Sequence, residues 1–364
     1  MDRFRPEPQF DHRNHVARDG VLLVNLGTPA APTTGAVRRY LAQFLSDPRV
    51  IEIPRALWLP ILYGAILVVR PTRSARKYRQ IWSDAGSPLA VHTARQAKLL
   101  SETLAARGPA WRVEHAMRYG EPSIGSALDR LRAAGCDRIL VLPLYPQYAA
   151  STTASAMDAV GAWMGGTRNV PELRFARHFH DHPAYIAALA AGVQRHWQVH
   201  GRGAKLVMSF HGLPKIALER GDPYHCECHK SARLLAAALE LGEDEWLVTF
   251  QSRFGRAAWL QPYTEPTLAR LAREGAARVD VVCPGFVADC LETLEEIGIV
   301  AKRAFLAAGG RELHLVPCLN DAPEWIRALD ALCAEHGWTA RAERTDDAAQ
   351  RQRQRQAAAL DATC

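Results

Sequence analysis

One histidine and a short row of glutamates are the residues of this sequence whose types and spacing best suit chemistry. His211 follows the apolar run 206–210 and precedes a glycine, which predicts an imidazole at the end of a strand. Glu292, Glu295 and Glu296 are spaced to share one face of an α-helix. Like charges at that spacing destabilise a helix, so the row favours holding a cation or protons, although a solvated helix face explains it equally well. An imidazole with a carboxylate suits a transiently bound Fe²⁺ or Zn²⁺.

Eight short apolar runs could form the strands that position these side chains. Four lie in each half of the chain, with helical patterns between them: 21–26, 112–118, 137–142, 173–177, 205–210, 246–250, 278–283 and 312–316. The runs are continuously apolar, as in parallel sheets that helices cover on both faces. We therefore expect an α/β fold of two similar Rossmann-like doubly wound domains, each with a four-stranded parallel sheet, facing each other across a cleft.

The two halves resemble each other where their strands end. Residues 22–29 and 207–214 both finish a strand with Gly-x-Pro, and this match pairs Leu26 with His211. Open α/β sheets bind ligands at the carboxyl ends of their strands. These strand ends are therefore expected to form the two walls of the cleft.

The chain divides into five expected segments. A polar N-terminal extension is followed by the first α/β domain, which carries a basic, apolar lip, and by the second α/β domain. A C-terminal helix that packs back between the domains and a low-complexity tail complete the chain. The expected ranges are 1–19, 20–180 with the lip at 38–79, 181–320, 321–338 and 339–364.

The lip carries the whole formal charge of +7, because it holds nine basic residues against two acidic ones. Within it, the uncharged stretch 56–69 is too short to span a bilayer, which takes about 20 helical residues. Apolar residues with Trp58 and Tyr63 between arginines favour a surface that rests on an anionic membrane, with a buried helical hairpin as the alternative. Nucleic-acid binding is a poorer account and is not expected, because the basic residues lack interleaved stacking aromatics and no reading module accompanies them.

Several function classes and locations are excluded by missing motifs. The sequence has no G-x-G-x-x-G, P-loop or G-x-S-x-G motif, so dinucleotide, nucleotide and α/β-hydrolase chemistry are unsupported. Its N-terminus has no apolar core of a secretory signal, so we expect a cytoplasmic protein, or one peripheral at the inner membrane. The eight cysteines show no regular framework and are expected to be reduced thiols.

Two further groups could bind metal but are interpreted as structural. The stretch His225-Cys-Glu-Cys-His229 resembles a soft-metal cluster, yet a helix start with incidental thiols is the preferred interpretation. His178, His180 and His182 alternate, and we expect exposed imidazoles at a strand-to-helix junction.

Six longer motifs in order resemble the ferrochelatase family, and the similarity runs from about residue 20 to 337. They are 21–29, 142–146, 209–214, 249–255, 259–264 and 283–296. The resemblance implies that Fe²⁺ is inserted into protoporphyrin IX to give protohaem, the terminal step of haem biosynthesis. A chelatase for coproporphyrin or sirohydrochlorin is the near alternative, and a non-catalytic tetrapyrrole or metal carrier is the other.

The resemblance also implies roles for individual residues. His211 and Glu292 match the pair that contacts the metal and performs catalysis, and Glu296, with Glu295 beside it, matches a path for protons or metal. The matched porphyrin-binding positions are Leu26, Arg118, Tyr119, Trp259 and Phe286, with Tyr145 placed less securely. Some relatives carry a histidine where this chain has Cys290, so the resemblance does not carry a role in metal passage over to this position.

Substrates, cofactors and partners follow from the same resemblance. Protoporphyrin IX and Fe²⁺ are the expected substrates, and no prosthetic group is expected. Some members hold a [2Fe-2S] cluster, but this chain lacks a closely spaced C-terminal trio of cysteines, so we do not expect one. The lip corresponds to the family's helical lip over the cleft, and the oligomeric state stays open.

Overall fold

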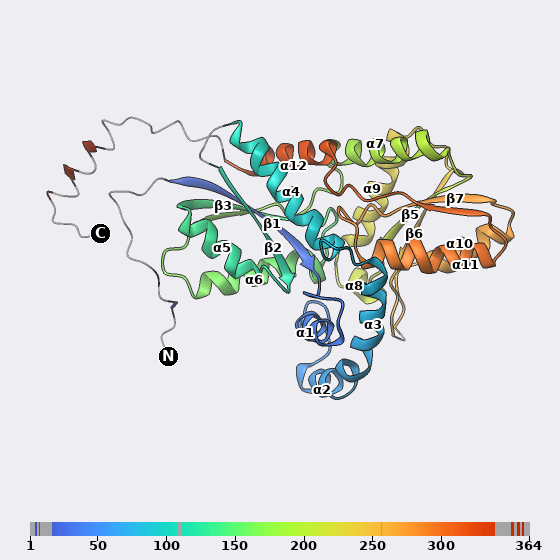
Figure 1. Cartoon of the computed structure of the whole chain (residues 1–364), viewed down its shortest axis with the longest axis horizontal. Coiled ribbons are helices and arrows are strands. Elements are labelled where there is room, and N and C mark those ends of the chain that lie inside the picture. The colour runs from blue at the N-terminus through green and yellow to red at the C-terminus, as the bar shows by residue number, and fades with distance from the viewer. Residues whose placement is uncertain are drawn as a thin grey trace.

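Two four-stranded parallel sheets lie one after the other along the long axis of the molecule (Figure 1). The computed structural model describes residues 4, 5, 7, 17–107, 111–255, 257–338, 351, 352, 355, 356 and 359. Most of the predicted extension 1–19 and of the tail 339–364 therefore lies outside the described residues. The strand orders are β2-β1-β3-β4 and β6-β5-β7-β8, the same arrangement twice. The predicted fold class is confirmed.

The eight strands agree with the predicted apolar runs to within three residues at each end. They are β1 Arg18–Gly27, β2 Trp111–Tyr119, β3 Cys136–Pro143, β4 Glu172–Phe175, β5 Leu206–His211, β6 Trp246–Gln251, β7 Arg278–Val282 and β8 Glu312–Leu315. β1 shows why the runs are continuous. Val21 and Leu23 join a core that extends to Met208 of the second sheet, while Leu22 and Val24 face the opposite layer. Side chains alternate between two buried faces, so both must be apolar.

Helices cover both faces of each sheet. The core shared by the two sheets is closed by α4 Pro88–Ala105, α7 Pro183–His200, α9 Tyr224–Ala238 and α12 Pro323–His336. The opposite faces are covered by α5 Ile124–Ala133 and α6 Ser155–Gly165 on the first sheet, and by α10 Thr264–Arg273 and α11 Lys302–Ala307 on the second. α12 lies beside α4 and α7 (Figure 1). The domain boundaries stay a prediction.

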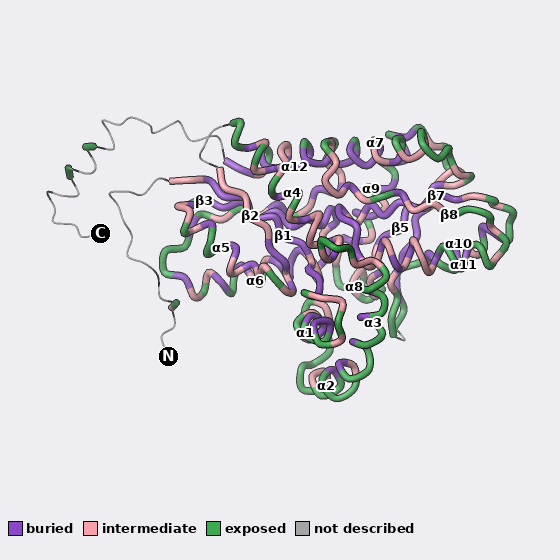
Figure 2. The backbone as a smooth tube through the Cα atoms, in the orientation of Figure 1, coloured by how far each residue is buried: buried purple, intermediate pink, exposed green. Residues whose placement is uncertain are grey.

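The lip projects from the body as a separate group of helices (Figure 1). It consists of α1 Thr34–Leu45, α2 Arg55–Ile61, the π-helix η1 Leu62–Ile66 and α3 Leu67–Ile81. Leu62 and Leu67 pack inward, whereas Leu57, Tyr63 and Val68 are each more than half exposed. Figure 2 shows most of α2 as exposed. One side of the lip is therefore core and the other is an exposed apolar surface, while contact with a membrane stays a prediction. No helix in the described part of the chain is long and apolar enough to cross a bilayer.

The acidic row lies on a π-helix rather than on the predicted α-helix. The π-helix η3 spans Glu292–Ala301 and continues into α11. Its i to i+5 hydrogen bonds widen each turn, so residue i+3 rotates further from residue i than in an α-helix. Shorter elements complete the fold: the π-helix η2 Ala150–Ala154 and the helix α8 Lys215–Glu219.

Candidate active site

His211 stands at the end of β5, where the strand order of the second sheet reverses. β5 pairs with β6 on one side and with β7 on the other, which is the point where open α/β sheets bind ligands. The Nδ1 atom of His211 lies 2.7 Å from the carbonyl oxygen of Gly212. A carbonyl only accepts hydrogen bonds, so Nδ1 is the donor and Nε2 is the ring nitrogen left for other contacts. The side chain lines a cavity and can act there as a base or a metal ligand.

The glycines of the repeated motif are required where each strand passes the end of its neighbour. A Cβ atom on Gly27 would lie 1.8 Å from the carbonyl oxygen of Tyr119, which ends β2. A Cβ atom on Gly212 would lie 2.7 Å from the carbonyl oxygen of Gln251, which ends β6. The two halves are therefore built alike at their strand ends, and the sequence match between them has a steric cause.

The cavity lies between the strand ends of the two sheets, and side chains from both halves line it. The first half supplies apolar and aromatic groups that include Leu26, Tyr40, Phe44, Tyr78 and Tyr145. The second half supplies His211, Trp259, Phe286 and Glu292, together with Phe254. Phe286 lies 6.5 Å from His211 between ring centroids, and Phe254 meets Trp259 edge to face at 4.8 Å. A flat apolar ligand fits such walls.

Glu292 brings a carboxylate to the same cavity from the first residue of η3. Its backbone oxygen accepts a hydrogen bond of 2.7 Å from the side-chain amide of Gln251, the last residue of β6. This bond ties the start of η3 to the second sheet. The structure thus brings the predicted pair, His211 and Glu292, to one cavity, where an imidazole nitrogen and a carboxylate can hold a divalent ion or accept protons.

The other two glutamates of the row point to different partners. Glu296 accepts hydrogen bonds from the backbone N–H and the hydroxyl of Ser252, at 2.6 and 2.5 Å. Glu295 is buried and pairs with Lys77 of α3 at 2.9 Å, so it joins the lip to the second sheet's helix layer. Neither of these glutamates is among the residues that line the cavity. Their proposed place on a path for protons or metal stays a prediction.

Arg118 and Tyr119 are also outside the cavity lining. Both bond to Asp47, which lies between α1 and α2: the guanidinium at 2.6 Å and the phenol at 2.8 Å. The hydroxyl of Ser155 donates to the same carboxylate oxygen at 2.6 Å. Tyr119 packs behind Phe44, with ring centroids 5.1 Å apart, and Phe44 forms the wall. The geometry makes this pair a support of the lip, which differs from the direct porphyrin contact that the resemblance implied.

Sequence reasoning missed Tyr40 and Tyr78, which face the cavity from the lip helices α1 and α3. Burial raises the pKa of both phenols well above the ordinary value, so they stay neutral. Each is an isolated tyrosine in a segment dominated by arginines, so spacing gave no signal. The hydroxyl of Tyr145 and the indole N–H of Trp259 are buried without a hydrogen-bond partner within the described chain, and both residues line the cavity. Both groups are therefore available to hydrogen-bond water or a polar group on a bound ligand.

The cysteine and histidine stretches take positions that only partly match the predictions. Residues 225–229 form the start of α9, with Cys228 buried and Cys226 exposed, so these two thiols point into different environments. Burial raises the pKa of Cys290, which lines the cavity as a neutral thiol. His180 is buried, so the prediction of exposed imidazoles is wrong for it, because α9 covers this segment.

Comparisons with known proteins agree with the geometry. The family model described as Ferrochelatase matches residues 18–337. Proteins named Ferrochelatase from Azoarcus sp. (strain BH72) and Aromatoleum aromaticum are 63% and 61% identical over 330 residues, which cover 91% and 90% of this chain and 90% of each relative. The Ferrochelatase of Polaromonas sp. is 57% identical over 350 residues, covering 95% of both chains.

Among solved structures, "SirB from Bacillus subtilis with Fe3+" aligns over 87% of this chain and 95% of its own, with a TM-score of 0.50 and 13% identity. At that identity the likeness shows a shared fold alone. The sequence matches carry the assignment, since they cover nearly the whole chain at high identity and include both walls of the cavity. The chain belongs to the ferrochelatase family.

Proposed function

We propose that the cavity between the two sheets is where this chain inserts Fe²⁺ into protoporphyrin IX, with His211 and Glu292 as the reacting side chains. Iron insertion into protoporphyrin is the function of the family, so the chain is a porphyrin metal chelatase, an enzyme of the lyase class. This sets aside the alternative of a non-catalytic carrier. The observation that carries the site assignment is the convergence of an imidazole and a carboxylate on one cavity with aromatic walls.

The cavity provides what the reaction demands of a protein. A free-base porphyrin gives up two pyrrole protons when a divalent ion enters, so two protons must be accepted for each ion inserted. Nε2 of His211 and the carboxylate of Glu292 can accept protons and contact the ion. Leu26, Trp259 and Phe286 form walls around the porphyrin ring. Walls that favour a bent macrocycle over a flat one would lower the free-energy barrier to metal insertion.

Protons and iron need a route between the cavity and solvent. Glu296 lies one turn beyond Glu292 on η3, and its carboxylate is anchored by Ser252 in the loop after β6. In this proposal Glu296 relays protons from Glu292, and Glu295 holds the lip in place through Lys77 while it lies beside that route. The anchoring by Ser252 favours a fixed relay position for Glu296 over a mobile one.

The porphyrin's carboxylates would meet the lip. The guanidinium carbon of Arg70, on α3, lies 5.7 Å from the ring centroid of Phe254, a cavity residue. A surface groove farther along the lip is bordered by Arg38 and Arg39 and by the exposed apolar residues Tyr63 and Val68. Arginine binds carboxylates and anionic lipid headgroups alike. In this proposal Arg70 pairs with a propionate, while the outer face of the lip rests on an anionic membrane.

Metal insertion by a histidine variant tests the site. We expect the purified chain to convert protoporphyrin IX with Zn²⁺ into zinc protoporphyrin, followed by fluorescence, and His211→Ala to lose at least about a hundredfold in rate. His200→Ala, which removes an exposed histidine at the end of α7, is the matched control and should keep the rate. The variant should still bind porphyrin in a fluorescence titration, because the walls are intact. Insertion by His211→Ala at the rate of the control would remove the site assignment.

Vesicle binding tests the membrane proposal separately. The chain should cosediment with phosphatidylcholine vesicles that contain phosphatidylglycerol at low salt, and less at high salt. Replacing Leu57, Tyr63 and Val68 together by serine should weaken binding at least tenfold, since each buried apolar side chain contributes about 1.5–3 kcal/mol. Val199→Ser, at an apolar residue of α7 that is 73% exposed, is the control. No binding by the unaltered chain would leave the lip as a cover over the substrate alone.

A further inference from the structure

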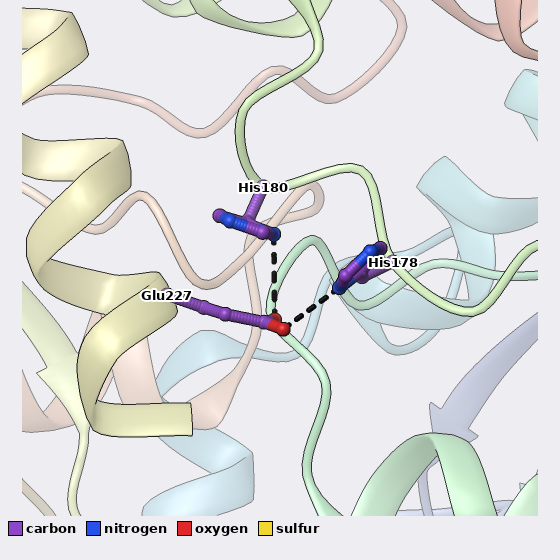
Figure 3. Close-up of side chains that lie close together, drawn as sticks. All are labelled: His178, His180 and Glu227. Atoms are coloured by element: carbon purple, nitrogen blue, oxygen red, sulfur yellow. Dashed lines mark hydrogen bonds and ion pairs between the residues drawn. The ribbon is translucent and has the colours of Figure 1, made fainter. Parts of the chain in front are cut away.

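Two histidines and a glutamate form a compact cluster that iron insertion does not use. His178 and His180 follow β4, and Glu227 points toward them from α9 (Figure 3). Nδ1 of His178 lies 2.7 Å from Oε1 of Glu227, and Nδ1 of His180 lies 3.4 Å from Oε2. None of the three lines the cavity of His211 and Glu292.

The cluster is buried, and one of its nitrogens lacks a hydrogen bond. The side chains of His180 and Glu227 are 6% and 7% exposed, whereas that of His178 is 34% exposed. Oε2 of Glu227 already accepts a 2.7 Å hydrogen bond from the backbone N–H of Tyr148. Nδ1 of His180 is buried without a hydrogen-bond partner in the described chain. Its contact with Oε2 of Glu227, at 3.4 Å, is longer than a normal hydrogen bond, so this nitrogen is open to a better partner such as a metal ion.

The donor set matches a borderline divalent ion. Two imidazoles and one carboxylate are the ligands that Zn²⁺ and Fe²⁺ commonly take in proteins. The three donor atoms all lie within 4.8 Å of one another, and a tetrahedral ion with bonds of about 2.0–2.1 Å needs them about 3.3 Å apart. Small side-chain rotations would reach that spacing.

The charged groups beside the cluster include an acidic and a basic side chain that pair with each other. Asp181 lies 3.9 Å from Nδ1 of His180, and its carboxylate is paired with Lys230 at 2.5 Å. The partly exposed ring of His178 opens the site to solvent. A second trio, His196 with Asp280 and His314, also holds a buried nitrogen without a hydrogen-bond partner in the described chain, Nε2 of His196. Its carboxylate is less available, because Asp280 already accepts hydrogen bonds from Trp197, Gly203 and Arg278.

We propose that His178, His180 and Glu227 bind one divalent transition-metal ion, such as Zn²⁺ or Fe²⁺, at a site separate from the insertion site. The site lies directly behind the cavity wall. Glu227 holds the backbone of Tyr148, and the hydroxyl of Ser231 donates to the backbone oxygen of His180 and accepts from Gln147, which lines the cavity. The inference does not rest on the proposed function, because it involves neither His211 nor Glu292.

Cobalt binding to the full chain tests the site. The parent protein carries His211→Ala and Glu292→Gln, which removes the insertion pair, and it is freed of metal by a chelator before Co²⁺ is added. The visible d–d absorption of Co²⁺ reports four-coordinate binding, and we expect one equivalent with a Kd in the micromolar range or below. In this parent, Glu227→Gln and His178→Ala should each weaken that binding at least about tenfold.

The controls keep the test decisive. His225→Ala with His229→Ala removes two other imidazoles from α9 and should leave Co²⁺ binding unchanged. His178 is partly exposed, so its alanine variant should fold even if Glu227→Gln does not, and far-UV circular dichroism checks both. The proposal is overturned if the parent binds no Co²⁺, or if His178→Ala binds as tightly as the parent. Either result would leave the cluster as an ion pair that only fastens α9 to the segment after β4.

Discussion

The two walls of the cavity come from equivalent places in two copies of one topology, yet they differ in chemistry. The first sheet ends at the wall with Leu26, and the second ends with His211, each before a glycine that the neighbouring strand requires. The first wall continues with neutral tyrosines from the lip, and the second with Glu292 from η3. The same topology thus provides an apolar wall in the first half and the side chains that bind protons and metal in the second.

The two walls differ because the two halves add different elements to the shared topology. The first half inserts the lip between β1 and β2, which gives the cavity a cover and two tyrosines. The second half has no such insertion and instead starts a π-helix after β7, which carries Glu292 to the cavity. Changes in the second wall should therefore stop the reaction, whereas changes in the first should alter stability or binding.

Glu292→Gln should have the largest effect of the following three changes. The amide keeps the size of the side chain but cannot accept a proton or bind a cation as a carboxylate does. We expect kcat for Zn²⁺ insertion to fall about 10²–10⁴-fold, with the Kd for porphyrin changed less than about threefold. The split between kcat in the fluorescence assay and Kd in a titration checks this. A loss of porphyrin binding with kcat preserved would make Glu292 part of the binding wall only.

Asp47→Asn should weaken the support of the first wall. It removes the acceptor charge that holds Arg118, Tyr119 and Ser155, at a cost of about 1–3 kcal/mol in the free energy of unfolding. Chemical denaturation at neutral pH measures this cost. If the variant matches the unaltered chain in stability, these bonds do not support the lip.

The pH dependence of unfolding gives a second test of the support that Asp47 provides to the first wall. Burial alone raises the pKa of Asp47, but hydrogen bonds from Ser155 and Tyr119 outweigh it and hold the pKa below the ordinary 3.8. The stabilisation is therefore complete above pH 3.8 and is lost as pH falls toward the lower pKa of the folded state. Asp47→Asn should lack this acid-side loss. The stability difference between the two proteins should narrow on acidification, and a constant gap would contradict the assigned pKa direction.

Leu26→Ala should have the smallest effect. It removes part of an apolar wall and no reacting group, so the loss of contact is about 1 kcal/mol. We expect KM for porphyrin to rise about fivefold, with kcat within about threefold of the unaltered value. Steady-state insertion assays over a range of porphyrin concentrations separate the two constants. A collapse of kcat would mean that the first wall shares in the chemistry, and the contrast between the halves would fail.

Much of this architecture could be predicted from the sequence, because its signals are local. The strands are continuous apolar runs, and the matched Gly-x-Pro motifs placed His211 and Leu26 at strand ends. The π-helix could not be predicted, since residues with i to i+5 bonds look like any helical run. Its wider turn rotates Glu295 away from the face that Glu292 and Glu296 share. Glu295 therefore meets Lys77 while Glu296 meets Ser252.

Contacts between segments that are distant in the sequence could not be predicted either. Tyr40 and Tyr78 line the cavity only because the lip folds back over the strand ends, and no local sequence pattern predicts that arrangement. The burial of His180 depends on α9, which lies well downstream in the sequence. Arg118 and Tyr119 were assigned to the porphyrin by resemblance, and only their bonds to Asp47 show that they stand behind the wall.

A single-turnover experiment on preformed porphyrin complexes tests most directly that the chemistry resides on the second wall. Protoporphyrin IX is fully bound to an excess of enzyme and then mixed with Zn²⁺, and fluorescence follows formation of the metalated ring in His211→Ala and Leu26→Ala side by side. We predict that Leu26→Ala metalates its bound porphyrin within about threefold of the unaltered rate, while His211→Ala is slower by at least about a hundredfold. Equal rates in the two variants would contradict the division of shape and chemistry between the halves.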